Sequence, residues 1–264
     1  HQFTKDLSDE LVNRAGDYNL KIEIEYAEFD AVRQSQIIDR FIERHFDAII
    51  LTPADSGRID ADIQKLNRAA IPVFTVDVAS LGNRGAVISH IASDNFQGGR
   101  VAASLMAEAL KGKGKVVIIN HPKVTSVMER VAGFRDGLKQ WPDIDVVADI
   151  PSWGQRDRAM SITEDLMLMM SDINGIFAIN DDSVMGALKA LNAGERAKNV
   201  VLVGYDATPE GRAEIDRGRV YADVVQYPRE IARQAMKTIA DYFAGRPVTP
   251  LNLIKTGTYR NERR

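Results

Sequence analysis

The sequence predicts an α/β fold built on parallel sheets. Short apolar runs of strand type alternate along the chain with longer segments of helical period, and this alternation is typical of parallel α/β proteins. Several runs are apolar almost throughout, for example residues 115–120 and 175–179, as expected for strands that helices cover on both faces. With 264 residues, the chain is long enough for one large domain or two small ones.

The predicted elements follow one another in chain order. The strands are Lys21–Tyr26, Ala48–Thr52, Val73–Val76, Lys115–Asn120, Val146–Ile150, Gly175–Ile179, Val200–Gly204 and Tyr221–Val225. The helices, each with an apolar face, lie at Phe3–Ala15, Arg33–His45, Ile59–Leu66, Asn95–Leu110, Thr125–Lys139, Asp157–Met170, Ser183–Leu191 and Arg229–Ala244. Because a helix is predicted before any strand, we expect the first strand of the first βα unit to be missing from this chain.

Composition and charge exclude several classes of protein and of site. The net charge is −3 and the isoelectric point about 5.9, so nothing in the electrostatics favours nucleic acid or an anionic membrane as partner. The chain has no cysteine, which excludes disulfides, thiolate metal sites and thiol nucleophiles. No segment approaches the run of about 18 apolar residues that indicates a transmembrane helix.

Polar side chains follow several predicted strands at the point where each strand ends. They are Asp77, Asn180, Asp206 and Gln226, and βα loops add Arg130 and Trp153. Ligands of open parallel sheets bind outside the carboxyl ends of the strands. Planar polar groups and one flat apolar ring suit a sugar, which has hydroxyls around its rim and C–H faces above and below. Any single Asp or Asn there is equally often only a helix cap or turn residue, so the argument depends on the set.

The segments around these residues resemble the ribose-binding branch of the periplasmic binding proteins over nearly the whole chain. They are VISHIASDNFQGGRVA at 87–102, IPVFTVD ending at Asp77, ERVAGF around Arg130, IFAINDDSVMGALKAL around Asn180, LVGYDATPEG around Asp206 and VVQYPREI around Gln226. Each is only moderately specific, but their order and spacing are together strong. The resemblance implies a type I periplasmic binding fold, with two doubly wound parallel-sheet lobes that close on one monosaccharide.

The resemblance also implies where the two lobes lie in the sequence. Three crossovers would fall near Ile91–Ser93, Gln226–Tyr227 and Leu251–Leu253. One lobe would then comprise residues 1–91 and 227–252, and the other residues 92–226 and 253–264.

The same resemblance assigns roles to the polar set. It implies that Asp77 and Arg130 bind sugar hydroxyls, that Asn180, Asp206 and Gln226 complete the ring of contacts, and that Trp153 stacks on the sugar.

Two departures from the ribose-binding pattern limit the choice of ligand. Ribose binders have an arginine directly after the strand-end aspartate, whereas this chain has Val78, which removes a charge-assisted donor. The first-strand loop, which supplies an asparagine and aromatic residues in that family, is also missing, and Gln2 is a candidate to face the ligand in its place. The ligand could therefore be another pentose, a hexose, a polyol or a sugar-like signal molecule.

Sequence patterns for catalysis, cofactors and metals are missing. The chain has no GxGxxG, GxxxxGK[ST], HExxH or GxSxG motif, so we expect no enzyme activity, no cofactor and no metal site. We expect Gly98 and Gly99 to allow close helix packing rather than phosphate binding. His121 is expected in a solvated loop.

The leading hypothesis is an extracytoplasmic solute-binding protein, periplasmic or extracellular, that delivers its sugar to an ABC transporter permease. Presentation of the sugar to a chemoreceptor or sensor kinase is a variant of this hypothesis. We expect a monomer that binds no nucleic acid. A sugar-modifying enzyme would instead turn its sugar over.

A second hypothesis is the effector-binding domain of a LacI-type transcription regulator, which shares the fold. It predicts an N-terminal helix-turn-helix and a basic face, and this sequence shows neither. Such regulators usually carry a Leu-Gly-His turn after the helix that corresponds to Asn95–Leu110, whereas the turn here contains no histidine.

Overall fold

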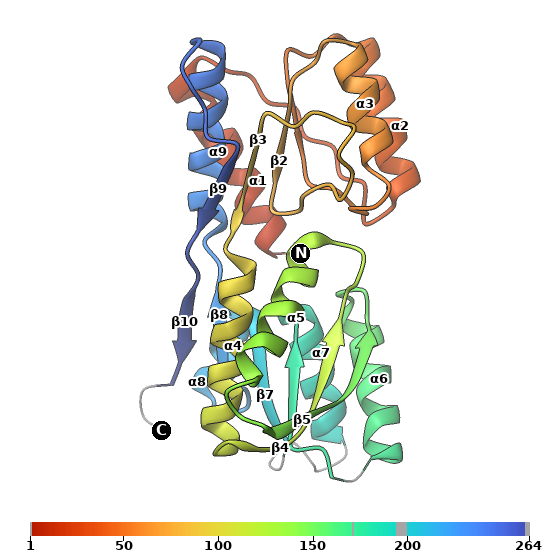
Figure 1. Ribbon diagram of the computed structural model, residues 1–264, viewed down its shortest axis with the longest axis vertical. Coiled ribbons are helices and arrows are strands. Elements are labelled where there is room, and N and C mark those ends of the chain that lie inside the picture. Colours follow the sequence, from red (N-terminus) through yellow and green to blue (C-terminus); the bar gives the residue numbers. More distant parts are fainter. Residues whose placement is uncertain (1, 171, 194–199, 262–264) are drawn as a thin grey trace. The chain divides into compact units, whose positions relative to one another are not determined.

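The computed structural model describes residues 2–170, 172–193 and 200–261. These residues form two compact units, whose elements are labelled in Figure 1. Unit 1 contains the residues up to Ser93 together with Lys123–Ser126 and Tyr227–Ile254, and unit 2 contains Asp94–Pro122, Val127–Gln226 and the residues from Lys255 onward.

Unit 1 is a parallel sheet with helices on both faces. Its strands have the order β1-β2-β3-β9, with bounds β1 Ile49–Leu51, β2 Val73–Val76, β3 Ser89–Ser93 and β9 Leu251–Ile254. Helices α1 (Gln2–Ala15) and α9 (Pro228–Phe243) share one apolar cluster with Val76 and Ile91. Helices α2 (Ala31–Glu43) and α3 (Asp60–Arg68) share the other with Ile49 and Val73. A short 3-10 turn, Gly16–Tyr18, follows α1.

The predicted strand Lys21–Tyr26 is wrong. The segment has no strand assignment, and β1 pairs only with β2 among the described residues. A strand needs backbone hydrogen bonds to a neighbour, so alternating side chains alone do not make one. The segment is held by side chains instead, since Arg44 Nη2 donates to Glu23 Oε2 at 2.6 Å and Arg40 pairs with Glu25.

Unit 2 is a larger sheet that is also covered on both faces. Its strand order is β10-β8-β7-β6-β4-β5, and β10 alone is antiparallel to its neighbour. The bounds are β4 Lys113–Asn120, β5 Asp143–Pro151, β6 Gly175–Ala178, β7 Val201–Asp206, β8 Ala222–Val225 and β10 Gly257–Arg260. The helices are α4 Asn95–Leu110, α5 Thr125–Leu138, α6 Arg156–Met169, α7 Asp181–Ala193 and α8 Pro209–Asp216.

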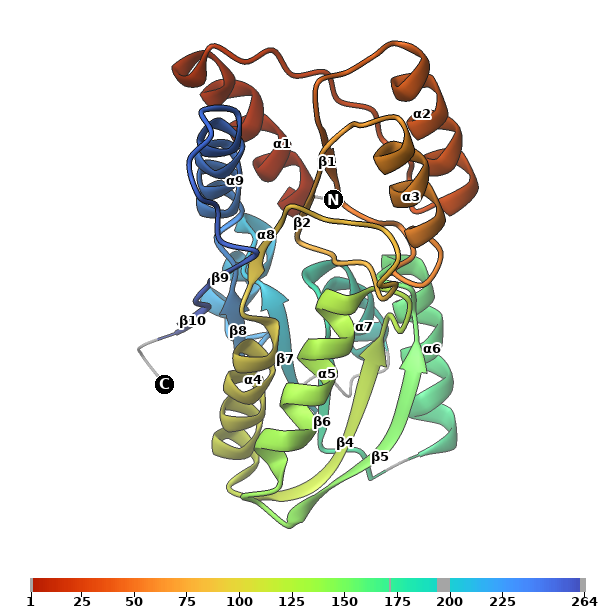
Figure 2. The same ribbon diagram turned by 45° about the horizontal axis from the view of Figure 1, so that its top comes forward.

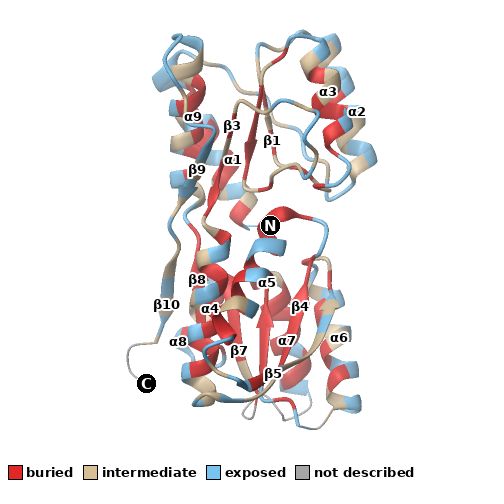
Figure 3. Ribbon diagram, in the orientation of Figure 1, coloured by how far each residue is buried: buried red, intermediate tan, exposed pale blue. Residues whose placement is uncertain are grey.

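The strands at the centre of unit 2 are the most deeply buried part of its sheet (Figure 3). On one side Val117 and Ile119 of β4 pack in a cluster with apolar residues of α6, α7 and α8. On the other side the rings of Phe134 in α5 and Phe177 in β6 stack at 4.4 Å between centroids. The predicted α/β fold with parallel, two-sided sheets is confirmed.

The strand order of unit 2 reverses at β4, as can be followed in Figure 2. The chain leads from β4 to β5 on one side of β4 and then to β6 on the other side. In open α/β sheets such a switch point leaves a crevice outside the carboxyl ends of the strands, and ligands bind there. The residues that follow these strand ends, His121, Trp153 and Asn180, therefore lie where a ligand is expected.

Candidate functional site

Three of the predicted ligand residues meet at the carboxyl edge of the sheet in unit 2. Gln226, directly after β8, donates from Nε2 to Oδ1 of Asp206 at 2.6 Å. Nη1 of Arg130, from α5, lies 3.8 Å from the same oxygen. All three side chains are buried. The group thus combines a guanidinium, a carboxylate and an amide within one small polar cluster.

The guanidinium of Arg130 is held in one orientation by groups of unit 2. Its Nε donates to Oδ1 of Asn95 at 2.9 Å, and its Nη1 donates to the carbonyl of Ile179 at 2.8 Å. Its plane lies over the ring of Tyr205, with 4.0 Å between the guanidinium carbon and the ring centroid. The hydroxyl of Tyr205 donates to the same Asn95 oxygen at 3.3 Å. A side chain held in this way loses little further entropy when it binds a ligand.

The contacts of Asn95 and Tyr205 with Arg130 are not predicted by the sequence. Only their places in the sequence could have indicated these contacts, because Asn95 follows the predicted crossover Ile91–Ser93 and Tyr205 precedes Asp206. The prediction for the two glycines on α4 is confirmed, since a Cβ on Gly98 would lie 2.0 Å from the Tyr205 hydroxyl. A Cβ on Gly99 would lie 2.1 Å from the Arg130 carbonyl oxygen. These glycines let α4 approach Tyr205 and the backbone of α5 closely.

Buried acidic groups surround Asp206. Burial raises the pKa of Asp206 to about 6, while Arg130 and Gln226 act in the opposite direction. The neighbouring Asp223 on β8 is fully buried, and burial raises its pKa to about 6 as well. Burial and the proximity of Asp223 raise the pKa of Asp181 well above its ordinary value. Asp206 therefore accepts a hydrogen bond from Gln226, and its pKa lies closer to neutral pH than that of an exposed aspartate.

Asn180 has a structural role at the start of α7. Its Oδ1 accepts a hydrogen bond from the backbone N–H of Ser183 at 3.0 Å, which is the geometry of a helix cap. Its Nδ2 donates to the carbonyl of Gly154 at 3.2 Å. The neighbouring Asp182 accepts a hydrogen bond from Nη2 of Arg156 at 3.0 Å. An amide held at both ends presents its remaining hydrogen and lone pair in a definite direction.

Trp153 lies in the loop that follows β5 and contacts a histidine. The backbone N–H groups of Ser152 and Trp153 both donate to the carbonyl of Asn120, at 2.9 and 3.2 Å. The indole packs edge-to-face with the ring of His121, with centroids 5.8 Å apart and planes at 82°. His121 is buried, so its predicted placement in a solvated loop is wrong. Burial against an aromatic ring accounts for the difference.

Three predicted ligand residues have a backbone that L-residues rarely adopt. The φ angles are 63° for Asp77, 60° for Trp153 and 107° for Asp206. Such conformations cost about 1–3 kcal/mol each and concentrate at binding and active sites, where the surroundings enforce them.

The other two predicted residues belong to unit 1. Asp77 follows β2, is half-buried and donates from its backbone N–H to the carbonyl of Ile91 at 2.9 Å. Val78, which replaces the arginine of the ribose binders, is buried. Gln2 is exposed in the first turn of α1, where its Nε2 donates to Oδ1 of Asp6 at 2.8 Å.

The family of this chain follows from its comparison with known proteins. Residues 1–247 match the family described as the periplasmic binding protein domain. The chain belongs to the periplasmic binding protein family. It is 30% identical over 231 residues to the ribose import binding protein of Bacillus subtilis, an alignment that covers 87% of this chain and 73% of that protein. It is 31% identical over 215 residues to the D-apiose import binding protein of Paraburkholderia graminis, covering 81% and 68% of the two chains.

Solved structures of the same fold agree with this assignment to the periplasmic binding proteins. The crystal structure of a Caulobacter myo-inositol binding protein with myo-inositol superposes with a TM-score of 0.91 at 28% identity. The superposition covers 98% of this chain and 89% of that one. These relatives are named for binding and import rather than for catalysis.

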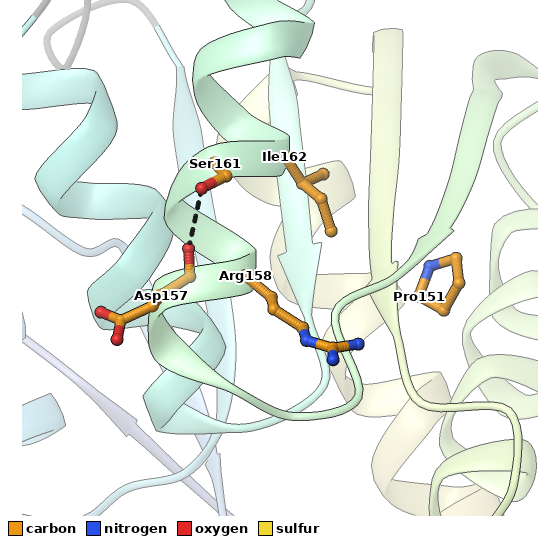
Figure 4. A pocket seen from close by; sticks show the side chains of 5 residues that line it. All are labelled: Pro151, Asp157, Arg158, Ser161 and Ile162. Atoms are coloured by element: carbon orange, nitrogen blue, oxygen red, sulfur yellow. Dashed lines mark hydrogen bonds between the residues drawn. The ribbon is translucent and has the colours of Figure 1, made fainter.

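A hollow in this periplasmic binding protein is lined by residues outside the polar cluster. It has a volume of about 350 Å³ and lies beside α6, lined by Pro151, Asp157, Arg158, Ser161 and Ile162 (Figure 4). None of the predicted ligand residues lines it. Over the described ranges, there is no group of three or more His, Cys, Asp or Glu side chains suited to a metal ion. No helix in the same ranges is both long and apolar enough to cross a membrane.

Proposed function

We propose that this protein captures one monosaccharide or a closely related polyol, and that Arg130, Asp206 and Gln226 of unit 2 bind its hydroxyls. The observation that carries the proposal is the buried cluster of these three side chains, in which protein groups hold the guanidinium in one orientation. A hydroxyl both donates and accepts, so a guanidinium beside a carboxylate satisfies both of its functions. Asn180 adds a further amide, and Trp153 an apolar ring for a C–H face.

The proposed contacts extend to unit 1. Asp77 of unit 1 follows β2 in a strained backbone conformation, and its carboxylate is proposed to accept a hydrogen bond from a sugar hydroxyl. Gln2 is the weakest member of the set, because its amide already bonds to Asp6 on its own helix. The side chain of Val78 is buried and supplies no donor, which disfavours the arginine-dependent hydrogen bonding of a strict ribose site.

The proposed activity is binding of the sugar without any covalent change to it. The site offers hydrogen-bond partners but no nucleophile with an adjacent base, and the family relatives are binding proteins. A bound sugar should therefore be recovered unchanged after long incubation with the protein, as judged by chromatography and NMR. Recovery of an altered sugar would replace this proposal with an enzymatic one.

The proposed setting is outside the cytoplasm, with delivery of the sugar to an ABC permease. The import role of the relatives supports this choice over the effector domain of a transcription regulator. Presentation to a chemoreceptor or sensor would use the same binding step. We propose that the protein acts as a monomer.

A ligand screen tests the proposal directly. Pentoses, hexoses and polyols are added one at a time, and the unfolding temperature is recorded. A ligand present at about 100 times its Kd should raise the free energy of unfolding by about 2.7 kcal/mol. In the variants Asp206→Asn and Arg130→Met, the affinity for that ligand should fall by about 10- to 100-fold, because a charge-assisted hydrogen bond is lost.

Arg135→Met is the matched control, because Arg135 lies on the same helix and its exposed side chain pairs with Asp149. Its affinity should equal that of the wild type. Equal affinities for Arg130→Met and Arg135→Met, with both proteins folded, would place the ligand elsewhere.

A further inference from the structure

His121 lies at the switch point of the sheet in unit 2, directly after β4. Only 8% of the residue is exposed, and its backbone N–H donates to the side-chain oxygen of Asn120 at 2.6 Å. Asn120 in turn donates from Nδ2 to Oδ1 of Asp149 on β5 at 2.8 Å. His121 therefore follows the end of β4, and a side-chain hydrogen bond links that strand end to the neighbouring strand β5.

The loop that carries Trp153 closes onto this same strand end. Two successive backbone N–H groups, of Ser152 and Trp153, donate to the carbonyl of Asn120. The chain then turns through left-handed conformations at Trp153 and Gly154, with φ of 60° and 69°. This turn brings the indole edge-to-face with the imidazole of His121.

Side-chain atoms of Asn180 and His121 lie close to Gly154, the residue after Trp153. A Cβ on Gly154 would lie 3.1 Å from Nδ2 of Asn180 and 3.5 Å from Cδ2 of His121. Asn180 also donates to the carbonyl of Gly154 at 3.2 Å. Residues from the ends of β4 and β6 thus flank one glycine turn, and they leave little freedom for the backbone of Trp153.

We infer that His121 is a positioning residue for ligand binding: its ring holds the indole of Trp153 in the orientation in which that indole stacks on the ligand. This inference rests on the proposed function. His121 is buried while Trp153 is partly exposed, so Trp153 touches the ligand and His121 acts through it. An edge-to-face pair is directional, and its loss frees the indole to rotate about its side-chain bonds.

A first experiment needs no ligand. The chain has two tryptophans, and Trp141→Phe leaves Trp153 as the only indole. In that background, time-resolved fluorescence anisotropy should show a larger fast component for His121→Ala, because the indole then rotates locally. His121→Phe should restore the slow decay, since a phenyl ring can make the same edge-to-face contact. Val117→Ala, on the same strand, removes buried atoms away from the indole and should leave the decay unchanged.

A second experiment is a double-mutant cycle on the affinity for the best ligand of the screen. His121→Ala alone should weaken binding about three- to tenfold, as expected for the loss of one aromatic pair. In a Trp153→Ala background the same change should have almost no effect, because His121 then has no indole to hold. A merely structural role would weaken binding equally in both backgrounds.

The two experiments separate the two proposals. If no sugar binds the wild type, the proposed function fails, while the anisotropy still decides whether His121 orders Trp153. If a sugar binds, two results would overturn the inference: unchanged anisotropy in His121→Ala, or an equal loss of affinity with and without Trp153.

Discussion

At the scale of single residues, the most unusual feature is a pair of buried acids behind Asp206. Among the described residues, no donor makes a hydrogen bond of good geometry to either carboxylate oxygen of Asp223 or to Oδ1 of Asp181, and all three atoms are buried. The backbone of Gly204 nevertheless acts to lower the pKa of Asp223. The other oxygen of Asp181 accepts from the backbone N–H of Thr208 at 2.6 Å. One proton shared between Asp181 and Asp223 would satisfy the group and avoid two like charges in a buried site. A Cβ on Gly204 would lie 2.1 Å from the Asp223 carboxylate, so that position has to be glycine.

This pair predicts that Asp223→Asn stabilises the protein at neutral pH. Burial raises the pKa of Asp223 from 3.8 to about 6 in the folded state, so its contribution to stability is fully present below pH 3.8. That contribution is lost as the pH rises through about 6, because the folded state then has to hold a buried charge. An asparagine stays neutral and can donate to Asp181. The gain should be on the order of 2 kcal/mol at pH 7.5 and near zero at pH 4, measured by urea unfolding.

Asp143→Asn is the control for this prediction, because Asp143 is exposed at the start of β5. Its stability should follow the wild type at every pH. A variant Asp223→Asn that is less stable than the wild type at pH 7.5 would mean that the charge of Asp223 is needed.

At the scale of elements, the contact between α4 and α5 positions Arg130 at the carboxyl edge of the sheet in unit 2. The two helices meet through glycines, since a Cβ on Gly99 would lie 2.1 Å from the Arg130 carbonyl and 2.7 Å from the Phe134 nitrogen. A Cβ on Gly133 would lie 2.0 Å from the carbonyl of Phe96. The obstacles are backbone atoms, so the helices themselves would have to move apart.

Gly99→Ala should therefore destabilise the protein by about 2 kcal/mol and weaken ligand binding, because it displaces α5 together with Arg130. Gly16→Ala is a fair comparison, because a Cβ on Gly16 has no neighbour within 4 Å. Calorimetric unfolding and ligand titration of both variants provide the measurement. If Gly99→Ala binds like the wild type, the close approach does not position Arg130.

The sequence predicted the elements whose pattern is local. Buried strands such as β4 and amphipathic helices such as α4 were found because their residues repeat with the period of the element. Helix α8 was missed, since it is short and depends on a Thr208 cap to the Gly211 N–H at 3.2 Å. Strand β10 was missed because its polar residues form a strand only by pairing with β8. The predicted strand Lys21–Tyr26 is wrong for the opposite reason. Its side chains alternate, but its backbone pairs with no strand among the described residues.

The same limit applies to the candidate site. Residues at strand ends, such as Asp206 and Gln226, could be proposed from their place after apolar runs. Their supports could not, because Asn95 lies 35 positions before Arg130 in the chain and meets it only in the folded unit. His121 was misplaced because its burial depends on Trp153, which belongs to another loop.

At the scale of the whole molecule, the chain is a periplasmic binding protein made of two units with the same layered design. Each unit places helices on both faces of a mostly parallel sheet, so loops at the carboxyl ends of the strands are free to carry binding residues. Unit 2 gathers Arg130, Asp206 and Gln226 into one cluster on such an edge. We propose that this cluster captures the sugar.

A crystal structure with the best ligand of the screen tests that claim most directly. We expect the sugar at the carboxyl edge of the sheet in unit 2, with hydroxyls within hydrogen-bonding distance of Arg130 and Asp206 and a C–H face against Trp153. A sugar bound instead in the hollow beside α6, or one that touches neither Arg130 nor Asp206, would contradict the account.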